Sequence, residues 1–188
     1  MKNNKKGFTL IELLAVIVIL AVVMLIAVSA VGPLMAKSRK GSLSDEGIGI
    51  VGAAQTAYQA EQMNATSVIK STSTVCFDLR YLNEKQYYTK GTGTDGYTGS
   101  VLAKYDDTTK KYSYTFWISN GTYVFGTPNN SGTLGIGVDP NAIDLDNTTM
   151  VKDGNTASNN CGGAATTSGN VYCELDGSTH KPKCTVSS

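Results

Sequence analysis

The sequence predicts an α+β protein: a long N-terminal helix whose hydrophobic half protrudes and whose amphipathic half packs under an antiparallel sheet. Three observations lead to this class. Residues 13–36 carry no charge, residues 48–62 repeat apolar side chains at helical spacing, and residues 100–126 hold strand-like runs joined by turn signals.

The composition limits the classes of function. The chain has 188 residues and a net charge of +1, so it lacks the positive field of a nucleic-acid-binding protein, and no specific nucleic-acid partner is expected. Residues 1–36 carry three lysines and one acid, whereas residues 37–188 carry 13 basic and 14 acidic side chains. The second part is rich in Thr, Ser, Asn, Gly and Tyr, which suits a solvated, β-rich domain.

The uncharged run at residues 13–36 is long enough to span a membrane, because a bilayer core needs about 20 apolar residues in a helix. A cleaved secretory peptide has an apolar region of only about 7–15 residues, followed by a small-residue cleavage site, and does not fit this run. Three positive charges precede the run and three follow it, so charge alone does not orient the chain. The cysteines, which all come later, favour a C-terminal part outside the cytoplasm.

Glu12 is an acid placed directly before the uncharged run. A charged side chain at the centre of a membrane helix costs about 2.5–3.5 kcal/mol, and less near the interface. One interpretation places Glu12 at the headgroup boundary, where it needs no partner. The other interpretation pairs it with a positive group.

The residues KKGFTLIEL, from Lys5 to Leu13, resemble the class III signal of type IV pilins and related pseudopilins. The resemblance implies that a prepilin peptidase of the membrane cleaves the chain between Gly7 and Phe8. It also implies methylation of the new amine of Phe8.

The same resemblance implies three segments: a cleaved leader at residues 1–7, a transmembrane and filament-core helix at residues 8–36, and an exported head at residues 37–188. We therefore expect a structural subunit of a type IV pilus. It would be stored as a single-pass protein of the cytoplasmic membrane, with the head outside. The pilus assembly machinery would then polymerise it with other copies into an extracellular helical filament for adhesion, twitching motility or DNA uptake.

A pseudopilin of a type II secretion or competence system is the alternative within this class, because pseudopilins share the signal. Their heads tend to be shorter and poor in cysteine, and often carry a calcium loop. The long head of this chain therefore resembles pilus subunits more closely.

The resemblance also suggests a partner for Glu12. Cleavage would create a cation at Phe8, and Glu12 of one subunit could pair with the Phe8 amine of a neighbour. Burying either charge alone costs desolvation free energy, and pairing the two charges offsets this cost. This pair would set the axial register and favour processed subunits over unprocessed ones, which lack the amine.

A membrane-tethered enzyme is a remote alternative. The sequence contains no GxSxG, HExxH or phosphate-binding glycine loop, and His180 is its only histidine. A Cys–His nucleophile pair would need a free thiol, which an even number of cysteines disfavours. We expect no catalytic residue, no cofactor and no bound metal.

The long helix is expected to weaken or bend at Gly32 and Pro33, because proline removes an amide donor and clashes with the carbonyl four residues back. The amphipathic pattern at residues 48–62 then predicts a helix that ends near Asn64. A separate second helix, joined at Gly41, is the alternative.

A short helix is predicted after the long one. Val75, Leu79 and Leu82 recur at helical spacing, and Arg80 precedes Glu84 by four residues, the separation at which side chains of a helix interact.

Three antiparallel strands are predicted over residues 100–126. A charged turn at residues 106–111 separates the first two, and Asn120-Gly121, a strong hairpin signal, separates the last two. We expect Trp117 and the strand tyrosines to serve core and cross-strand packing rather than ligand binding.

Residues 127–169 are mostly Gly, Asn, Thr and Asp and are expected to form loops. Asp139, Asp144 and Asp146 could hold calcium, but they lack an EF-hand pattern, and metal is not expected there.

The four cysteines, Cys76, Cys161, Cys173 and Cys184, are expected to form two disulfides because they lie in the exported part and their number is even. The favoured pairs are Cys173–Cys184, which would close a hairpin around an Asp-Gly turn, and Cys76–Cys161. A zinc site made of Cys161, Cys173, His180 and Cys184 is the alternative, although no CxxC pair is present and the spacing matches no standard zinc finger.

Overall fold

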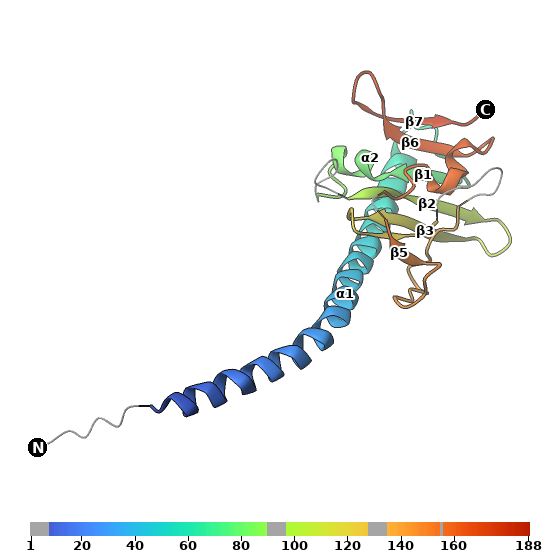
Figure 1. Ribbon diagram of the computed structural model, residues 1–188. Coiled ribbons are helices and arrows are strands. Elements are labelled where there is room, and N and C mark those ends of the chain that lie inside the picture. Colours follow the sequence, from blue (N-terminus) through green and yellow to red (C-terminus); the bar gives the residue numbers. More distant parts are fainter. Residues whose placement is uncertain (1–7, 90–96, 128–134, 155) are drawn as a thin grey trace, which may run out of the picture. The chain divides into compact units, whose positions relative to one another are not determined.

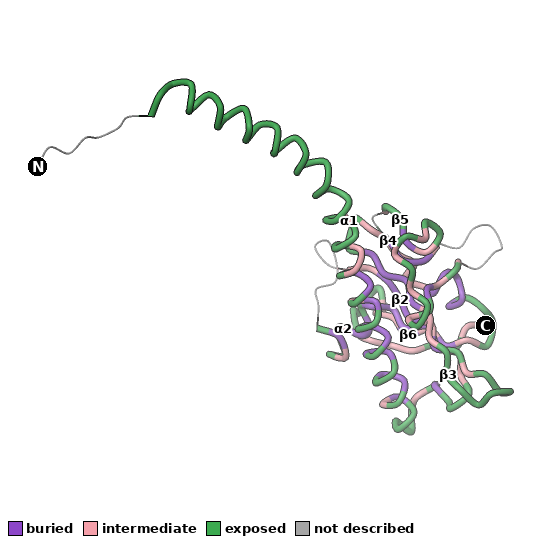
Figure 2. Tube along the Cα trace, turned by 90° about the horizontal axis from the view of Figure 1, so that it is seen from below, coloured by how far each residue is buried: buried purple, intermediate pink, exposed green. Residues whose placement is uncertain are grey.

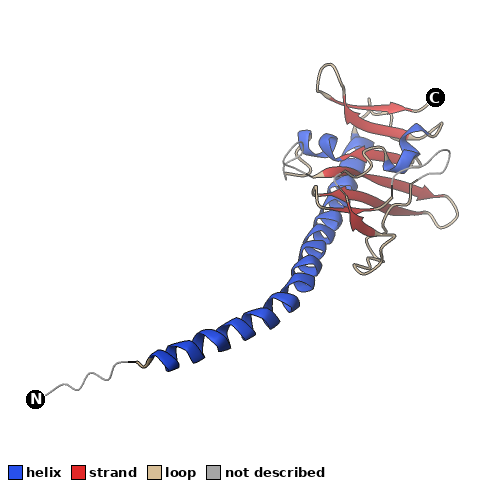
Figure 3. Cartoon of the chain, viewed as in Figure 1, coloured by secondary structure: helices blue, strands red, loops and turns tan. Residues whose placement is uncertain are grey.

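The computed structural model describes residues 8–89, 97–127, 135–154 and 156–188 (Figure 1). The chain divides into two compact units, Met1–Arg39 and Lys40–Ser188. As predicted, the protein is an α+β chain in which a long N-terminal helix is followed by a mostly antiparallel sheet (Figure 3).

Helix α1 spans Leu10–Met63, 54 residues, and ends within one residue of the predicted boundary. It is one helix, so the alternative of a second helix joined at Gly41 is wrong. The helix also continues through Gly32 and Pro33 without a break. Whether these two residues open the helix in a filament stays a prediction.

One seven-stranded sheet forms the head, in the order β5-β4-β3-β2-β1-β6-β7. All pairs are antiparallel except β1 with β6, which is parallel. The described elements that follow α1 are β1 (Val75–Asp78), α2 (Leu79–Glu84), β2 (Thr98–Asp106), β3 (Lys111–Ser119), β4 (Tyr123–Phe125), β5 (Val151–Asp153), the 3-10 helix η1 (Cys161–Thr166), β6 (Val171–Leu175) and β7 (Pro182–Val186).

The main core lies between the sheet and the part of α1 that belongs to the head. Ile50, Ala54 and Ala57 of α1 are fully buried and share one hydrophobic cluster with Phe77 and Phe116 of the sheet. These helix residues recur at intervals of three and four, which places them on one face of α1. The predicted amphipathic half is thus packed as expected.

A second, smaller core covers the opposite face of the sheet. Cys76 and Trp117 pack there against Cys161, Ala164 and Ala165 of the η1 segment. Because neighbouring residues of a strand point to opposite faces, Cys76 faces this core while Phe77 faces α1. Trp117 is a core residue, as predicted, and its indole N–H donates to the carbonyl of Thr127 at 3.1 Å.

The short helix predicted from Val75 is partly wrong. Residues 75–78 form β1, which lies between β2 and β6 and is buried along its whole length. Only Leu79–Glu84 is helical, and Asp78 begins this helix as its N-cap by accepting the Arg80 N–H at 2.8 Å. Arg80 forms its ion pair with Asp78, two residues earlier, rather than with the expected Glu84.

The three strands predicted over residues 100–126 are β2, β3 and β4, and the Asn120-Gly121 turn joins the last two. Asn120 accepts the N–H groups of Thr122 and Tyr123 at 3.0 Å, and Gly121 has a φ of 84°, which glycine adopts without strain.

The loop predicted at residues 127–169 contains two elements that were not expected. β5 adds an edge strand to β4, and η1 carries the second core.

Gly47 and Gly49 of α1 offer a matched test of this packing. A Cβ on Gly47 would overlap the ring of Phe116, which is fully buried, whereas a Cβ on Gly49 meets no atom within 4 Å. Gly47→Ala should therefore lower the melting temperature, because overpacking costs about 1–3 kcal/mol. Gly49→Ala should raise it slightly, since alanine favours a helix by up to about 1 kcal/mol over glycine. Thermal unfolding of both variants checks this, and equal melting temperatures would contradict the packing described.

Candidate processing and assembly site

The first turn of α1 contains a reciprocal hydrogen-bonded pair, Thr9 and Glu12. The N–H and the hydroxyl of Thr9 both donate to Oε2 of Glu12 at 2.8 Å, and the N–H of Glu12 donates to Oγ1 of Thr9 at 3.3 Å. Helix α1 begins at Leu10, so Thr9 is in the N-cap position and Glu12 is the third helical residue. This arrangement is a capping box, which satisfies N–H groups that have no partner inside the helix.

The capping box gives Glu12 a role within the single chain that the sequence analysis did not identify. The Thr-x-x-Glu spacing directly before an apolar run is the known signature, so the pattern was readable from the sequence. Among the described residues, no hydrogen bond involves Oε1, the other carboxylate oxygen. One oxygen of Glu12 thus fixes the start of the helix, and the other accepts no hydrogen bond from the residues that the structure describes.

The described part of the first unit, residues 8–39, is apolar and exposed over most of its length. Every residue from 8 to 35 is exposed (Figure 2). Phe8 is 90% exposed. Of the helices described, α1 alone is long and apolar enough to cross a membrane. At 1.5 Å per residue, the uncharged run 13–36 has a length of about 36 Å, enough for a hydrocarbon core of about 30 Å.

The sequence-predicted residues are thus partly placed. Gly7 and the leader 1–7 lie outside the described residues. Phe8 lies two residues before α1, Glu12 lies in the first turn of the helix, and Gly32 and Pro33 lie inside it.

Residues 2–28 match the family model of the prokaryotic N-terminal methylation motif. This motif is the class III signal of type IV prepilins, and it indicates a type IV pilin-like or pseudopilin protein. It implies processing by a prepilin peptidase and handling by a membrane assembly machinery. Signal and apolar helix together fit a membrane-anchored protein of the pilin type.

No curated protein and no solved structure matches the chain.

The four cysteines form two disulfides, Cys76–Cys161 and Cys173–Cys184, in the pairing favoured from the sequence. The first joins β1 to η1 across 85 residues, and the second joins directly opposite residues of the β6–β7 hairpin. None of the cysteines is free. These bonds leave no thiolate for the zinc alternative or for a cysteine nucleophile.

The polar groups buried in the head have structural partners. The carboxylate of Asp78, 1% exposed, pairs with Arg80, and Glu61 accepts the hydroxyl of Tyr81 at 3.0 Å and lies 3.5 Å from the ammonium of Lys85. Burial, together with the negative charge of Glu61, raises the pKa of Tyr81 well above its usual range. These groups join α1, α2 and the sheet to one another, although Glu61, Tyr81 and Lys85 also line a small surface pocket of about 200 Å³.

The remaining candidate ligands occupy turns. His180 lies in the loop between β6 and β7, where its backbone N–H donates to the backbone carbonyl of Asp176. Asp139 and Asp144 each accept the N–H of the residue two positions later, the usual aspartate turn. Within the described ranges, no group of three or more acidic, histidine or cysteine side chains is placed to hold a metal ion.

Proposed function

We propose that the chain is a structural subunit of a type IV pilus. It is processed at Gly7–Phe8, held in the cytoplasmic membrane through residues 8–36, and polymerised through the same helix into a surface filament. The observation that supports the proposal is an exposed apolar helix that begins inside the methylation motif of residues 2–28 and continues beyond it. A surface of this size requires lipid or other copies of the chain to cover it.

The assembly role of Glu12 follows from the same helix. The positively charged amine of Phe8 in a neighbouring subunit could donate a hydrogen bond to Oε1 of Glu12 and form an ion pair with the carboxylate. The capping box keeps the carboxylate at the helix start before assembly, so pairing requires little rearrangement.

A pseudopilin of a secretion or competence system is the second candidate, because it carries the same motif. The head favours the pilus, because residues 37–188 contain a seven-stranded sheet and two disulfides, whereas pseudopilin heads tend to be shorter and poor in cysteine.

Electron microscopy of cells before and after deletion of the gene tests this proposal, with antibodies raised against the head. We expect surface filaments that the antibodies label along their length, that disappear on deletion and that return with the wild-type gene. If the antibodies do not label the surface filaments of the wild type, and the deletion strain carries as many filaments as the wild type, the pilus role is contradicted and the pseudopilin role is favoured.

Processing has its own test in Gly7→Val. Glycine is the one amino acid without a side chain, and the peptidase is expected to require it before the scissile bond. The branched side chain of valine at this position should therefore block cleavage. We expect the variant to accumulate in the membrane with its leader attached, as an unprocessed band on a denaturing gel. Cleavage of Gly7→Val at the wild-type rate would show that Gly7 does not define the site.

A further inference from the structure

One edge of β3 is open over about half of the strand. β4 pairs only with Ile118 and Ser119, and Val138 forms a single bridge with Phe116. None of the described residues pairs with residues 111–115 on that side, although β2 pairs with the whole strand on the other side.

Pro140 explains why the chain itself does not fill this edge. An antiparallel strand continuing from the Phe116–Val138 bridge would bring residue 140 beside Tyr114. Proline has no N–H to donate to the ladder. The chain instead turns away, with Asp139 accepting the N–H of Asn141 at 2.8 Å.

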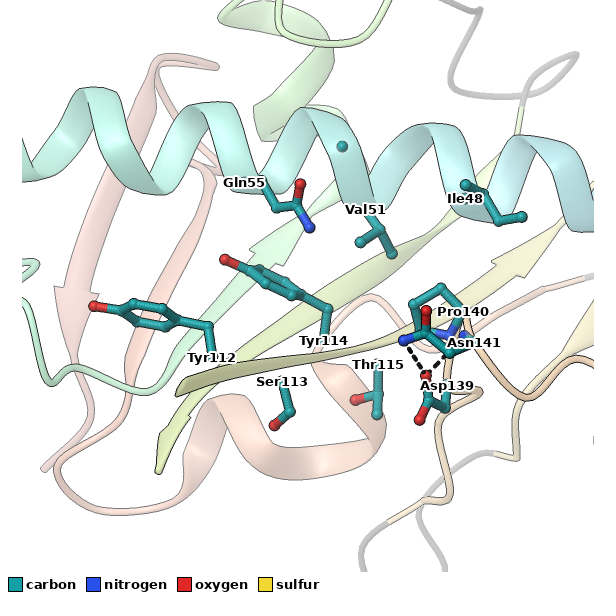
Figure 4. Close-up of a pocket in the computed structure, with 11 residues that line it drawn as sticks. Ile48, Val51, Gln55, Tyr112, Ser113, Tyr114, Thr115, Asp139, Pro140 and Asn141 are labelled. Atoms are coloured by element: carbon teal, nitrogen blue, oxygen red, sulfur yellow. Dashed lines mark hydrogen bonds between the residues drawn. The ribbon is translucent and has the colours of Figure 1, made fainter. Parts of the chain in front are cut away.

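A groove of about 710 Å³ runs along this open edge, between β3 and the head part of α1 (Figure 4). Ile48, Val51, Gly52 and Gln55 of α1 line one side. Ile48 is 47% exposed, and a Cβ on Gly52 would meet no atom within 4 Å. The groove therefore offers room and apolar surface next to unpaired backbone.

The backbone of β3 presents two residues to the groove. Phe116 directs both its N–H and its C=O to Val138, at 3.0 and 2.9 Å. Residues of a strand alternate in direction, so Tyr114 and Tyr112 direct their N–H and C=O groups to the same side. In the described chain these groups have no backbone partner there.

The outer edge of β7 matches this edge. β7 is the last strand of the sheet, and Ser187, directly after it, exchanges backbone hydrogen bonds with Gly169 and Asn170 on the β6 side. By the same alternation, Cys184 and Val186 direct their backbone groups away from β6. The Val186 side chain is 54% exposed.

We propose that the groove beside β3 receives β7 of a second copy, which adds to the sheet as a further strand. Each edge offers two hydrogen-bonding residues, and the pairing would cover the exposed side chains of Ile48 and Val186. The contact joins two different edges, so it is heterologous and continues from copy to copy instead of closing a dimer. It rests on the proposed function, because only an assembling subunit meets other copies in this order.

A cysteine pair tests the contact directly. Ser113 and Thr185 lie between the hydrogen-bonding residues of their strands, so they lie opposite each other in either strand direction. Both are exposed. Full-length Ser113→Cys and Thr185→Cys chains are co-expressed, and sheared filaments and membranes are analysed on non-reducing gels. We expect a disulfide dimer that joins the two variants and that neither variant gives alone.

Gly52→Trp and Gly49→Trp provide the matched control, introduced separately into the Ser113→Cys chain. Both glycines are exposed on α1 with open space at Cβ, but only Gly52 lines the groove. Gly52→Trp should abolish the mixed dimer by filling the groove, and Gly49→Trp should leave it unchanged.

The outcomes separate this contact from the proposed function. Filaments that form without the mixed dimer, or a mixed dimer that survives Gly52→Trp, would overturn the strand pairing and leave the pilus role intact. A chain that never enters a filament would overturn both.

Discussion

Glu12→Ala subunits should accumulate in the membrane and yield few or no surface filaments. The substitution removes a charge from an apolar helix, so insertion should be as good as in the wild type or slightly better. Assembly should fail because the Phe8 amine of each neighbour would be buried without a partner. Losing one partner of a buried ion pair typically costs about 3–5 kcal/mol, and in a filament the loss repeats at every subunit.

Glu12→Gln separates charge from hydrogen bonding. The amide oxygen can still accept the N–H and hydroxyl of Thr9, so the capping box can form, but the side chain carries no charge. We expect an intermediate filament yield. A yield as low as that of Glu12→Ala would assign the whole effect to charge, and a wild-type yield would assign it to the cap.

The measurement compares membrane-pool protein and sheared filaments for the wild type and both variants, with the leader shown to be removed in each. A normal filament yield from processed Glu12→Ala would show that assembly does not need the carboxylate, which would contradict the proposed pair.

Removal of the Cys76–Cys161 disulfide should destabilise the head more than removal of Cys173–Cys184. In the chain-entropy model, cross-links across 85 and 11 residues contribute about 4.6 and 2.8 kcal/mol. The longer cross-link also holds η1 over the second core, where Cys76, Cys161 and Trp117 are buried. The double variants Cys76→Ala/Cys161→Ala and Cys173→Ala/Cys184→Ala compare the two bonds.

Thermal unfolding of these two variants, with and without reductant, tests the ranking. We expect both to melt below the wild type, the Cys76/Cys161 variant at the lower temperature, and the differences to shrink when all samples are reduced. The opposite ranking, or peptide maps that show other pairs, would contradict the arrangement of β1 and η1.

The elements that the sequence predicted well are those with local signals. α1 follows from an uncharged run and an amphipathic repeat, and the β2–β4 meander follows from short strands around strong turns. The β6–β7 hairpin likewise has its turn between two cysteines. Each of these patterns depends on residues near one another in the chain.

The elements that were missed depend on distant residues. β1 is buried on both faces because α1 and η1 cover it and β6 pairs with it from almost 100 residues away, so its sequence, VCFD, lacks the alternation of a half-buried strand. β5 has only three residues, too few for a sequence pattern, and it is a strand because it pairs with β4. The pairing of Arg80 with Asp78 follows from this boundary, because a residue that ends a strand can cap the next helix.

At the N-terminus, the processing site and the assembly role of Glu12 stay predictions from the sequence, while the structure adds the bond of Glu12 to Thr9. That bond was within reach of sequence reasoning, since it joins residues three positions apart. The groove beside β3 was not, because it depends on where Pro140 turns the chain after a single bridge.

Intact-mass and N-terminal peptide analysis of the chain in sheared surface filaments is the most direct test of its proposed role. We expect every copy to begin at N-methylated Phe8 and to carry two disulfides, while leader-bearing chains are confined to the membrane. Filaments built from chains that still contain residues 1–7, or surface filaments that lack this chain altogether, would contradict the proposal that processing at Gly7–Phe8 produces a pilus subunit.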